Sequence, residues 1–411
     1  MFIKKGQAKI IKNSRNEKTI EIRIKTYKGF FMASSPSGKS KGKNEVEEYN
    51  PRGIVWSRKL AEVFLKKIEG KNLSIENLDD LKEFEKNILS FESNFGELGG
   101  NVVYSLETAI LKAAAKEKSK ELWELIAKFS SNNLIKMPLL VGNCVGGGLH
   151  STEVEGKKPD FQEFLLIPKE RNISKSVTKN IHAYFYVKKL LSKKQGKIKT
   201  KPNDESAWRT KLANEEVLNL LEAAAKKYGL KIGIDMASST FFSKNGYYEY
   251  KNKKLVRDRT EQEDYSRILI KKYGLFYVED PLHEEDFSGF TEILSQINSK
   301  KTLIVGDDLT TTNLKRVERA IRANAVNAVI IKPNQIGSLV ETAKVFNLCK
   351  KNNIKTIFYH SSGETMDDAL ADLAVGFGAD FVKTGIYGRE RLIKLKRLIE
   401  IEKNLYSKHF N

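Results

Sequence analysis

Cysteine is scarce in this chain: Cys144 and Cys349 are the only two in 411 residues. Their spacing matches no metal-binding motif, and two cysteines are too few for a disulfide framework. The sequence therefore argues against a thiolate zinc site. We expect both residues to be small, buried and apolar in character.

Long apolar runs are also missing. No stretch of about eighteen apolar residues occurs, which argues against a membrane-spanning helix. The first residues carry basic side chains but lack the apolar core of a signal peptide. We therefore expect a cytoplasmic protein without a membrane partner.

Acidic residues are fewer than basic ones, and the formal net charge is therefore +20. Such a balance attracts anions, and the run KKQGKIKTK at 193–201 is strongly basic. However, no aromatic-interleaved RNA motif or zinc finger occurs, and lysines are spread along the whole chain. We do not expect nucleic acid as a partner, although a non-catalytic basic binding protein stays open as an alternative.

The order of patterns predicts two domains. Residues 1–133 combine strand-like alternation, a Gly/Ser/Lys loop at 36–43 and several helical patterns, which is typical of an α+β unit. From 134 to 411, strands recur at intervals of roughly 25 to 30 residues with helices between them, as in a parallel sheet. There are enough such units to close a β/α barrel of about 250 residues.

Six consecutive strands of the second domain carry an ionisable residue at their C-terminal ends. The clearest is LFYVEDP at 275–281, where an apolar run ends in two acids and a proline. In β/α barrels these strand ends surround one mouth, where the catalytic groups lie. The residues are Asp235, Glu279, Asp307, Lys332, His360 and Lys383.

Three of these residues are carboxylates that would repel one another in a semi-enclosed mouth. A divalent cation resolves the repulsion, and oxygen ligands without cysteine or histidine favour Mg²⁺. Lys332 and Lys383 lie beside this predicted site, where cationic neighbours favour a neutral amine that can act as a base. Such a base suits removal of a proton α to a carboxylate, with Glu205 or Glu163 as the acid.

Each residue also has a simpler explanation. A lone acid at a strand end is commonly a turn former or part of an ion pair. A lone lysine there usually extends its amine to solvent. It is the combination of residues that favours catalysis.

The chain resembles the enolases from end to end. The likeness rests on GIDMASSTFF, VEDPLHEEDF, VGDDLTTTN, IIKPNQIGS, HSSGETMDDALADLAVG and VKTG, in that order. It extends to NSRNEKTIEI, PSGKSKG and GGNVVYSLETAILKAAA in the first domain. The resemblance implies an α/β barrel of the ββαα(βα)6 order with an N-terminal α+β capping domain. It also implies interconversion of 2-phosphoglycerate and phosphoenolpyruvate with two Mg²⁺ ions, in a homodimer or larger symmetric assembly.

The resemblance implies a role for each matching residue. Asp235, Glu279 and Asp307 would hold the first Mg²⁺, and Ser40 of the mobile loop would bind the second. Lys332 would be the general base and Glu205 the proton donor, aided by Glu163. The residues that match substrate-binding positions are His150, Gln162, His360, Ser362 and Lys383.

Three departures from the family pattern stand out. Ser361 replaces the arginine that clamps the phosphate, and a serine offers only one uncharged donor in place of a bidentate guanidinium. The segment NDESAWRT keeps the acid but changes its surroundings, and Lys39 and Lys41 flank Ser40. Arg209 or these lysines could restore the missing charge. If none does, the substrate would be a different 2-substituted carboxylate.

Overall fold

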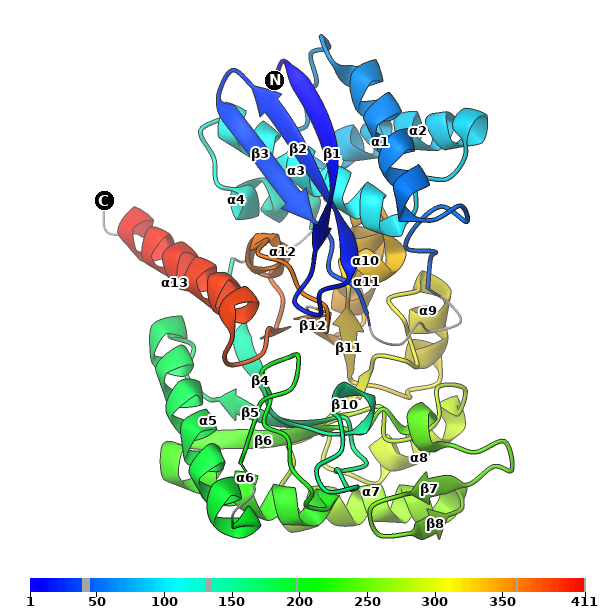
Figure 1. The fold of residues 1–411 in the computed structure, drawn as a ribbon, viewed down its shortest axis with the longest axis vertical. Helices are drawn as coiled ribbons and strands as arrows, with labels where there is room; N and C mark the ends of the chain where they lie inside the picture. Colours follow the sequence, from blue (N-terminus) through cyan, green and yellow to red (C-terminus); the bar gives the residue numbers. More distant parts are fainter. Residues whose placement is uncertain (39–44, 131–134, 197–198, 360, 410–411) are drawn as a thin grey trace.

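The computed structural model describes residues 1–38, 45–130, 135–196, 199–359 and 361–409 (Figure 1). It consists of an N-terminal unit that sits over one end of a barrel. The predicted boundary at 133/134 and most of the predicted loop at 36–43 lie outside the described residues. The two-domain division with those limits stays a prediction.

The N-terminal unit is an antiparallel sheet backed by helices. Ile20, Ile22 and Ile24 alternate along the central strand and are fully buried, because one face of the sheet packs on helices α1 and α3. The strands are β1 (Lys5–Lys12), β2 (Lys18–Thr26) and β3 (Gly29–Ser34). The helices are α1 (Ile54–Ile68), α2 (Leu78–Phe95), α3 (Gly100–Glu117) and α4 (Leu122–Ile126).

The second unit is a closed barrel in which each strand neighbours the next one in sequence. Strand β5 runs antiparallel to both of its neighbours, and the other pairings are parallel. The strands are β4 (Leu139–Gly146), β5 (Glu163–Pro168), β6 (Leu230–Asp235), β9 (Tyr277–Glu279), β10 (Leu303–Gly306), β11 (Ala328–Ile331), β12 (Lys355–Tyr359) and β13 (Phe381–Lys383).

Helices surround the barrel, and two of them follow β5 before the next strand begins. This order confirms the predicted ββαα(βα)6 barrel with an N-terminal α+β domain. The helices are α5 (Ile173–Gln195), α6 (Asn214–Tyr228), α7 (Arg259–Tyr273), α8 (Phe287–Ser295), α9 (Leu314–Arg322), α10 (Pro333–Ile336), α11 (Leu339–Lys351), α12 (Ala369–Phe377) and α13 (Arg389–His409).

Three local features differ from the sequence-based expectation. The sequence has a helical pattern over about 119–130, but the structure forms only α4 there, followed by a 3₁₀ turn, Ala127–Phe129. The sequence has a helical pattern over about 365–377, but helix α12 begins only at Ala369, whose backbone N–H donates to the Asp367 carboxylate. A short hairpin of β7 (Tyr248–Tyr250) and β8 (Leu255–Arg257) was not predicted.

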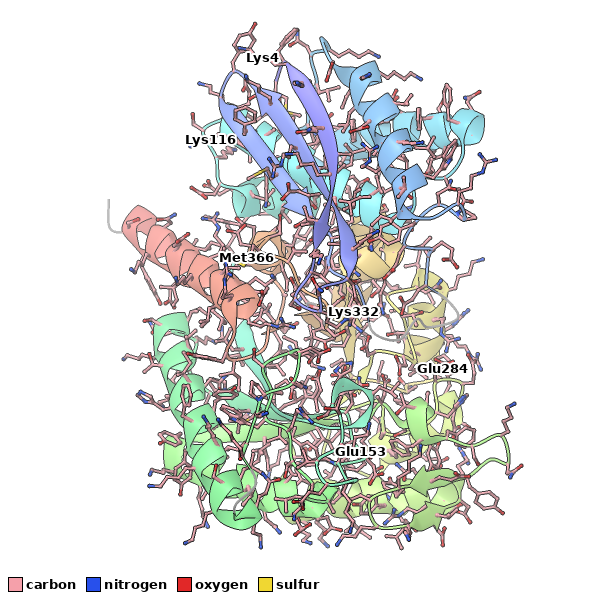
Figure 2. All side chains as sticks on the ribbon, viewed as in Figure 1. Lys4, Lys116, Glu153, Glu284, Lys332 and Met366 are labelled. Atoms are coloured by element: carbon pink, nitrogen blue, oxygen red, sulfur yellow. The ribbon has the colours of Figure 1, made fainter. Side chains whose placement is uncertain are left out.

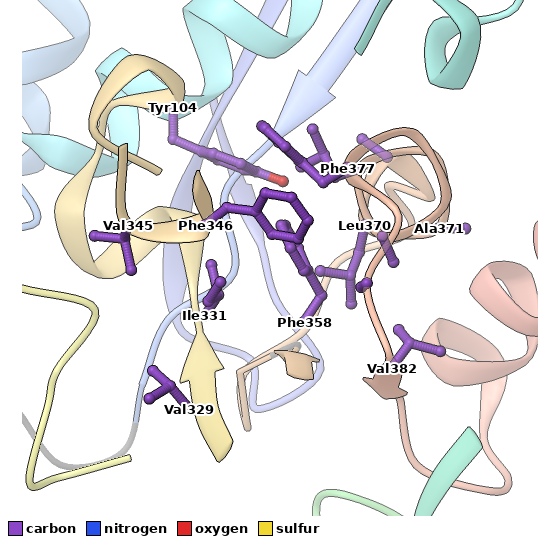
Figure 3. Packing of buried hydrophobic residues seen from close by; sticks show 14 of the residues in the cluster. Tyr104, Val329, Ile331, Val345, Phe346, Phe358, Leu370, Ala371, Phe377 and Val382 are labelled. Atoms are coloured by element: carbon purple, nitrogen blue, oxygen red, sulfur yellow. The ribbon is translucent and has the colours of Figure 1, made fainter. Parts of the chain in front are cut away.

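The hydrophobic core continues from the barrel into the N-terminal unit. Phe358 of β12 stacks on Phe377 of α12 with ring centroids 5.5 Å apart, and Phe346 of α11 lies 5.3 Å from Phe377. Tyr104 of α3 lies over this group (Figure 3). The two units therefore share apolar packing at their junction.

Close backbone contacts join the same two units. Ser37 and Gly363 exchange both backbone hydrogen bonds, each at 2.9 Å. The buried Glu107 carboxylate of α3 accepts the backbone N–H of Leu339, the first residue of α11. These contacts fix the N-terminal unit over the barrel mouth.

Both cysteines are buried and free, as predicted. No helix among the described residues has the length and apolar character needed to span a membrane.

Candidate active site at the barrel mouth

Glu163, Asp235 and Glu279 form one row across three neighbouring strands. The antiparallel register places Glu163 opposite Asp235, and the parallel register places Asp235 opposite Glu279. Because β5 is reversed, Glu163 begins its strand while the other two end theirs. The barrel thus brings together three acids that are distant in sequence; Asp235 and Glu279 belong to the strand-end pattern, whereas Glu163 does not.

A cleft opens beside this row, between the barrel mouth and the N-terminal unit. Figure 2 labels Lys332 at this junction. The cleft is lined by Gly38, Glu45, His150, Gln162, Asp307, Asp308, Lys332, Asn334, Gln335, Tyr359, Ser361 and Ser362. Five predicted site residues therefore face one space: His150, Gln162, Asp307, Lys332 and Ser362.

Lys383 lies among the acids of the row. Its Nζ is 2.8 Å from Glu163 Oε2, 2.8 Å from Glu279 Oε2 and 3.4 Å from Asp235 Oδ2. The Tyr277 hydroxyl donates a further hydrogen bond of 2.6 Å to Glu279. Burial opposes the charge on Lys383, but the surrounding carboxylates raise its pKa well above the usual value. This lysine is a fully buried ammonium group.

The carboxyl groups at the mouth still exceed the positive charge available to them. Burial raises the pKa of Asp235 to about 6, with Lys383 acting against the shift and Glu163 and Asp307 adding to it. Burial also raises the pKa of Glu279 well above its usual value, and Asp235 adds to that shift. The site therefore favours an additional cation.

Asp307 and Lys332 form a second group at the ends of β10 and β11. Lys332 Nζ lies 2.5 Å from Asp307 Oδ2. Asp280 braces the same loop, since its carboxylate accepts the backbone N–H groups of Asp307, Asp308 and Leu309. Burial and Asp307 together raise the pKa of Asp308 to about 7.

Lys332 differs from expectation in its charge. We predicted a readily neutralised amine, yet its pKa is raised above the ordinary lysine value. Burial acts to lower this pKa, but the Asp307 carboxylate outweighs burial because it is so close.

His150 joins the two candidate acids. Its Nδ1 lies 3.0 Å from Glu205 Oε1 and 3.3 Å from Glu163 Oε1. Asn143 donates to Glu205 Oε2 at 3.1 Å, and the Tyr359 hydroxyl donates to Glu163 at 3.1 Å. Burial lowers the pKa of His150, but Glu205 and Glu163 more than offset this and raise it to about 10.

The predicted metal ligands fit a hard cation in chemistry and charge. The three predicted for the first ion, Asp235, Glu279 and Asp307, are carboxylates, and Asp307 Oδ1 is buried without a hydrogen-bond partner among the described residues. Two tight acidic groups could each hold an ion within the described part of the chain: His150 with Glu163 and Glu205, and Asp280 with Asp307 and Asp308. The predicted trio of Asp235, Glu279 and Asp307 is not one of these compact groups. Lys383 contacts Asp235 and Glu279, and Lys332 contacts Asp307.

Two further residues named from the sequence, Gln162 and Arg209, lie in different places. Gln162 donates to Asp235 Oδ2 at 3.4 Å, and so lies beside the row of acids. Arg209 lies elsewhere, because its guanidinium donates to the backbone carbonyl of Glu153 at 3.0 Å. Figure 2 labels Glu153 and Lys332 at well-separated places. Arg209 does not line the cleft.

Four residues from the predictions, Lys39, Ser40, Lys41 and His360, lie outside the described residues.

The sequence reasoning missed several residues of the site. Tyr359 precedes His360 on an inward-facing strand end, and Asp280 follows Glu279, so neighbouring positions were a usable signal. Asn143 and Arg15 had no such signal, because each lies far in sequence from the residue it contacts, which is Glu205 for Asn143 and Ser362 for Arg15. Arg15 comes from the N-terminal sheet and donates to the Ser362 hydroxyl.

Comparisons with known proteins cover nearly the whole chain. Residues 3–126 match the model of the enolase N-terminal domain, and residues 134–410 match that of the enolase C-terminal TIM barrel domain. An enolase of Picrophilus torridus is 36% identical over 414 residues, covering 98% of this chain and 99% of the relative. An enolase of Methanosphaera stadtmanae is 36% identical over 403 residues, covering 96% and 95%.

Proposed function

Because the chain belongs to the enolase family, we propose that it catalyses the reversible, Mg²⁺-dependent dehydration of 2-phosphoglycerate to phosphoenolpyruvate. It is a carbon–oxygen lyase of the hydro-lyase class, and its relatives named enolase support this reaction. The observation that carries the proposal is the single cleft lined by Lys332, Asp307 and His150, with Glu205 directly behind His150.

The carboxylates of Asp235, Glu279 and Asp307 would hold the first Mg²⁺. Bound there, Mg²⁺ supplies positive charge that stabilises the carboxylate of the substrate as the C2 proton leaves. The second Mg²⁺ and its ligand Ser40 stay predictions. The excess of negative charge at the mouth supports binding of a second cation.

Lys332 is the proposed general base that removes the C2 proton. Its side chain is only partly buried, at 13% exposed, and lines the cleft, so it can reach a bound substrate. The pKa of Lys332 depends on how much of the Asp307 charge it experiences. If Asp307 also bound a cation, its negative charge would be partly neutralised, and the pKa of Lys332 would fall.

Glu205 is the proposed acid that assists departure of the C3 hydroxide. It is 2% exposed, and Asn143 fixes one of its oxygens. His150 Nδ1 is 3.0 Å from the other oxygen, so the imidazole holds the Glu205 carboxyl group in position. Glu163 lies 3.3 Å from the same nitrogen of His150, and we propose that it aids Glu205.

The other roles follow the same arrangement. We propose that Gln162, His360, Ser362 and Lys383 bind or orient the substrate. A homodimer in the cytoplasm is also part of the proposal, and light scattering of the purified protein would check the assembly.

A spectrophotometric assay tests the function. Purified protein given 2-phosphoglycerate and Mg²⁺ should produce the ultraviolet absorbance of an enol phosphate. Lys332→Ala should lower turnover by roughly 10³-fold, within the range for loss of a general base. Lys344→Ala is the matched control, because Lys344 forms an exposed pair with Glu341 on α11 and should retain activity.

A second candidate is the same proton abstraction on another 2-substituted carboxylate. It is favoured by Ser361, whose hydroxyl donates to Asn334 at 3.3 Å and carries no charge. The result that would favour it is no absorbance change at high enzyme concentration, with Mg²⁺ binding intact by calorimetry.

A further inference from the structure

The described residues that line the cleft offer little free positive charge for a phosphate group. The cations among them are His150 and Lys332. His150 is paired with Glu205 and Glu163, and Lys332 is paired with Asp307. A phosphate dianion in this cleft therefore needs positive charge from beyond the lining.

Arg15 lies directly behind the cleft wall at Ser362. One guanidinium nitrogen, Nη1, donates to the Ser362 hydroxyl, and Nη2 donates to the carbonyl of Gly38 at 2.9 Å. Both acceptors belong to residues that line the cleft. The Arg15 side chain is 8% exposed, so its charge is only weakly screened by solvent.

The turn that carries Arg15 is rigidly fastened. The Asn13 side chain accepts the backbone N–H groups of Arg15 and Glu17, and donates to the Ser37 hydroxyl at 2.8 Å. Glu17 accepts from Arg15 Nε at 3.0 Å and from Nη2 at 2.5 Å. Because the Glu17 side chain is 51% exposed, water screens its charge more than that of Arg15.

The hydrogen bond from Arg15 determines whether the Ser362 hydroxyl donates or accepts toward the cleft. A hydroxyl has one proton to donate and two lone pairs that accept. Since Arg15 occupies a lone pair, the hydroxyl proton is left to donate, and no described residue accepts it. Ser362 is thus set to donate to an anion in the cleft, polarised by the guanidinium behind it.

A second guanidinium holds the backbone of the same serine. Arg391 of α13 is fully buried and donates from Nη2 to the Ser362 carbonyl at 2.8 Å. Its Nε and Nη1 have no hydrogen-bond partner among the described residues. Its nearest carboxylate contact is Glu390, 3.9 Å away. Two arginines from opposite ends of the chain thus converge on Ser362.

We propose that Arg15, acting through Ser362, determines recognition of the substrate phosphate in this chain. The Ser362 hydroxyl donates to a phosphate oxygen, Arg15 polarises and orients it, and Arg391 fixes its backbone. Arg15 is a positioning residue and replaces in effect the guanidinium that Ser361 lacks. The inference rests on the proposed function, because it assumes a phosphorylated acid as substrate.

The test compares Arg15→Gln, Arg15→Lys and a control variant, Arg23→Gln. Arg23 pairs with Glu21 on β2 and is more exposed, at 36%. Loss of a hydrogen bond from a charged donor lowers affinity by roughly 10- to 100-fold. Arg15→Gln should therefore raise KM for 2-phosphoglycerate at least tenfold while kcat changes less, and Arg15→Lys should recover part of the loss. Arg23→Gln should behave as the wild type.

Inorganic phosphate supplies a readout that does not depend on turnover. Calorimetry should show phosphate binding to the wild-type protein, weakened by about tenfold or more in Arg15→Gln. In the double variant Arg15→Gln with Ser361→Arg, a guanidinium at the family position should restore phosphate affinity. A protein that binds phosphate through Arg15 but does not dehydrate 2-phosphoglycerate would support the inference and contradict the proposed function.

Two results would overturn the inference. One is a folded Arg15→Gln variant, checked by circular dichroism, whose KM and phosphate affinity both stay within twofold of the wild type. The other is a fall in kcat as large as the predicted rise in KM, with the affinity for phosphate unchanged. A purely structural role of Arg15 would produce that result.

Discussion

Lys383 Nζ lies 2.8 Å from Glu279 Oε2, and both side chains are almost completely buried. Lys383 is also in contact with Glu163 and Asp235. One ammonium group thus holds three buried acids together. Removing it would leave carboxylates that water cannot reach.

We predict that Lys383→Met lowers the free energy of unfolding by about 3 to 5 kcal/mol at neutral pH, the usual effect of breaking a buried ion pair. Urea unfolding in the presence of a chelator measures this. The loss should shrink in acid, because protonation of Asp235 removes the repulsion. Burial already raises the pKa of Asp235 to about 6, and removing Lys383, which acts against that shift, would raise it further.

Lys272→Met is the control, since Lys272 forms an exposed pair with Glu215. It should leave stability nearly unchanged, because water screens an exposed ion pair. Equal losses in the two variants would contradict the central role of Lys383.

The imidazolium of His150 should make stability depend on pH on the alkaline side. Glu205 and Glu163 overcome the effect of burial and raise its pKa to about 10, against about 6.5 for an unperturbed histidine. A raised pKa contributes stability that is complete below about 6.5 and is lost as the pH rises to about 10. Chemical denaturation across this window should show a steeper decline for the wild type than for His150→Gln. Parallel curves would mean that His150 is uncharged.

Gly337 lies at a backbone contact between α10 and α3. Its φ is +75°, and a Cβ there would come 2.5 Å from the Gly100 Cα. Gly337→Ala should therefore cost both conformational strain and a steric clash at the domain junction. Thermal unfolding should show a loss clearly greater than the strain alone.

Gly246→Ala measures that strain by itself. Gly246 has a φ of +83°, and its Cβ would meet nothing within 4 Å. This variant should lose about 1 to 2 kcal/mol. If Gly337→Ala loses no more than Gly246→Ala, the backbone contact is not close in solution.

Asp380 connects three lysines at the opposite end of the barrel from the cleft. Its carboxylate lies 2.8 Å from Lys136, 2.8 Å from Lys350 and 3.4 Å from Lys355. Burial acts to raise the pKa of Asp380, but hydrogen bonds from Lys136 and Lys350 outweigh burial and hold it well below the usual value. Asp380→Asn should lose roughly 3 kcal/mol at neutral pH in urea unfolding.

The sign of the pH dependence follows from the depressed pKa. The contribution of Asp380 is present above about pH 3.9 and is lost as the pH falls further. The difference between the wild type and Asp380→Asn should therefore narrow in acid. Asp264→Asn removes an exposed partner of Arg267 and should have little effect at either pH.

The ionisable residues at the strand ends could be predicted because the signal, an apolar run that ends in a charged residue, lies within a few residues of sequence. Asp235, Glu279 and Lys383 each end an apolar run, and the rule that such ends meet at one mouth brings them together. The small-domain helices were also recognisable from their period, as α3 shows with its buried Val102, Leu106 and Ile110.

Contacts between segments that are distant in sequence could not be predicted. Arg15 approaches Ser362 only because the N-terminal sheet sits over the barrel, and no pattern near residue 15 marks that contact. The charge of Lys332 was likewise missed, since it depends on a 2.5 Å approach to Asp307 rather than on residue type. Short elements such as β7 and β8 lack enough residues for their period to be visible.

The reversed direction of β5 has a consequence for how this scaffold tolerates change. In the parallel strands, the loop that follows the strand opens onto the cleft. After β5, the connection at 169–172 instead emerges at the far end, and the segment before the strand supplies His150 and Gln162. Lengthening or randomising residues 169–172 would reshape the base of the molecule and leave the chemistry untouched, which makes that connection a suitable point for inserting a tag or a second protein.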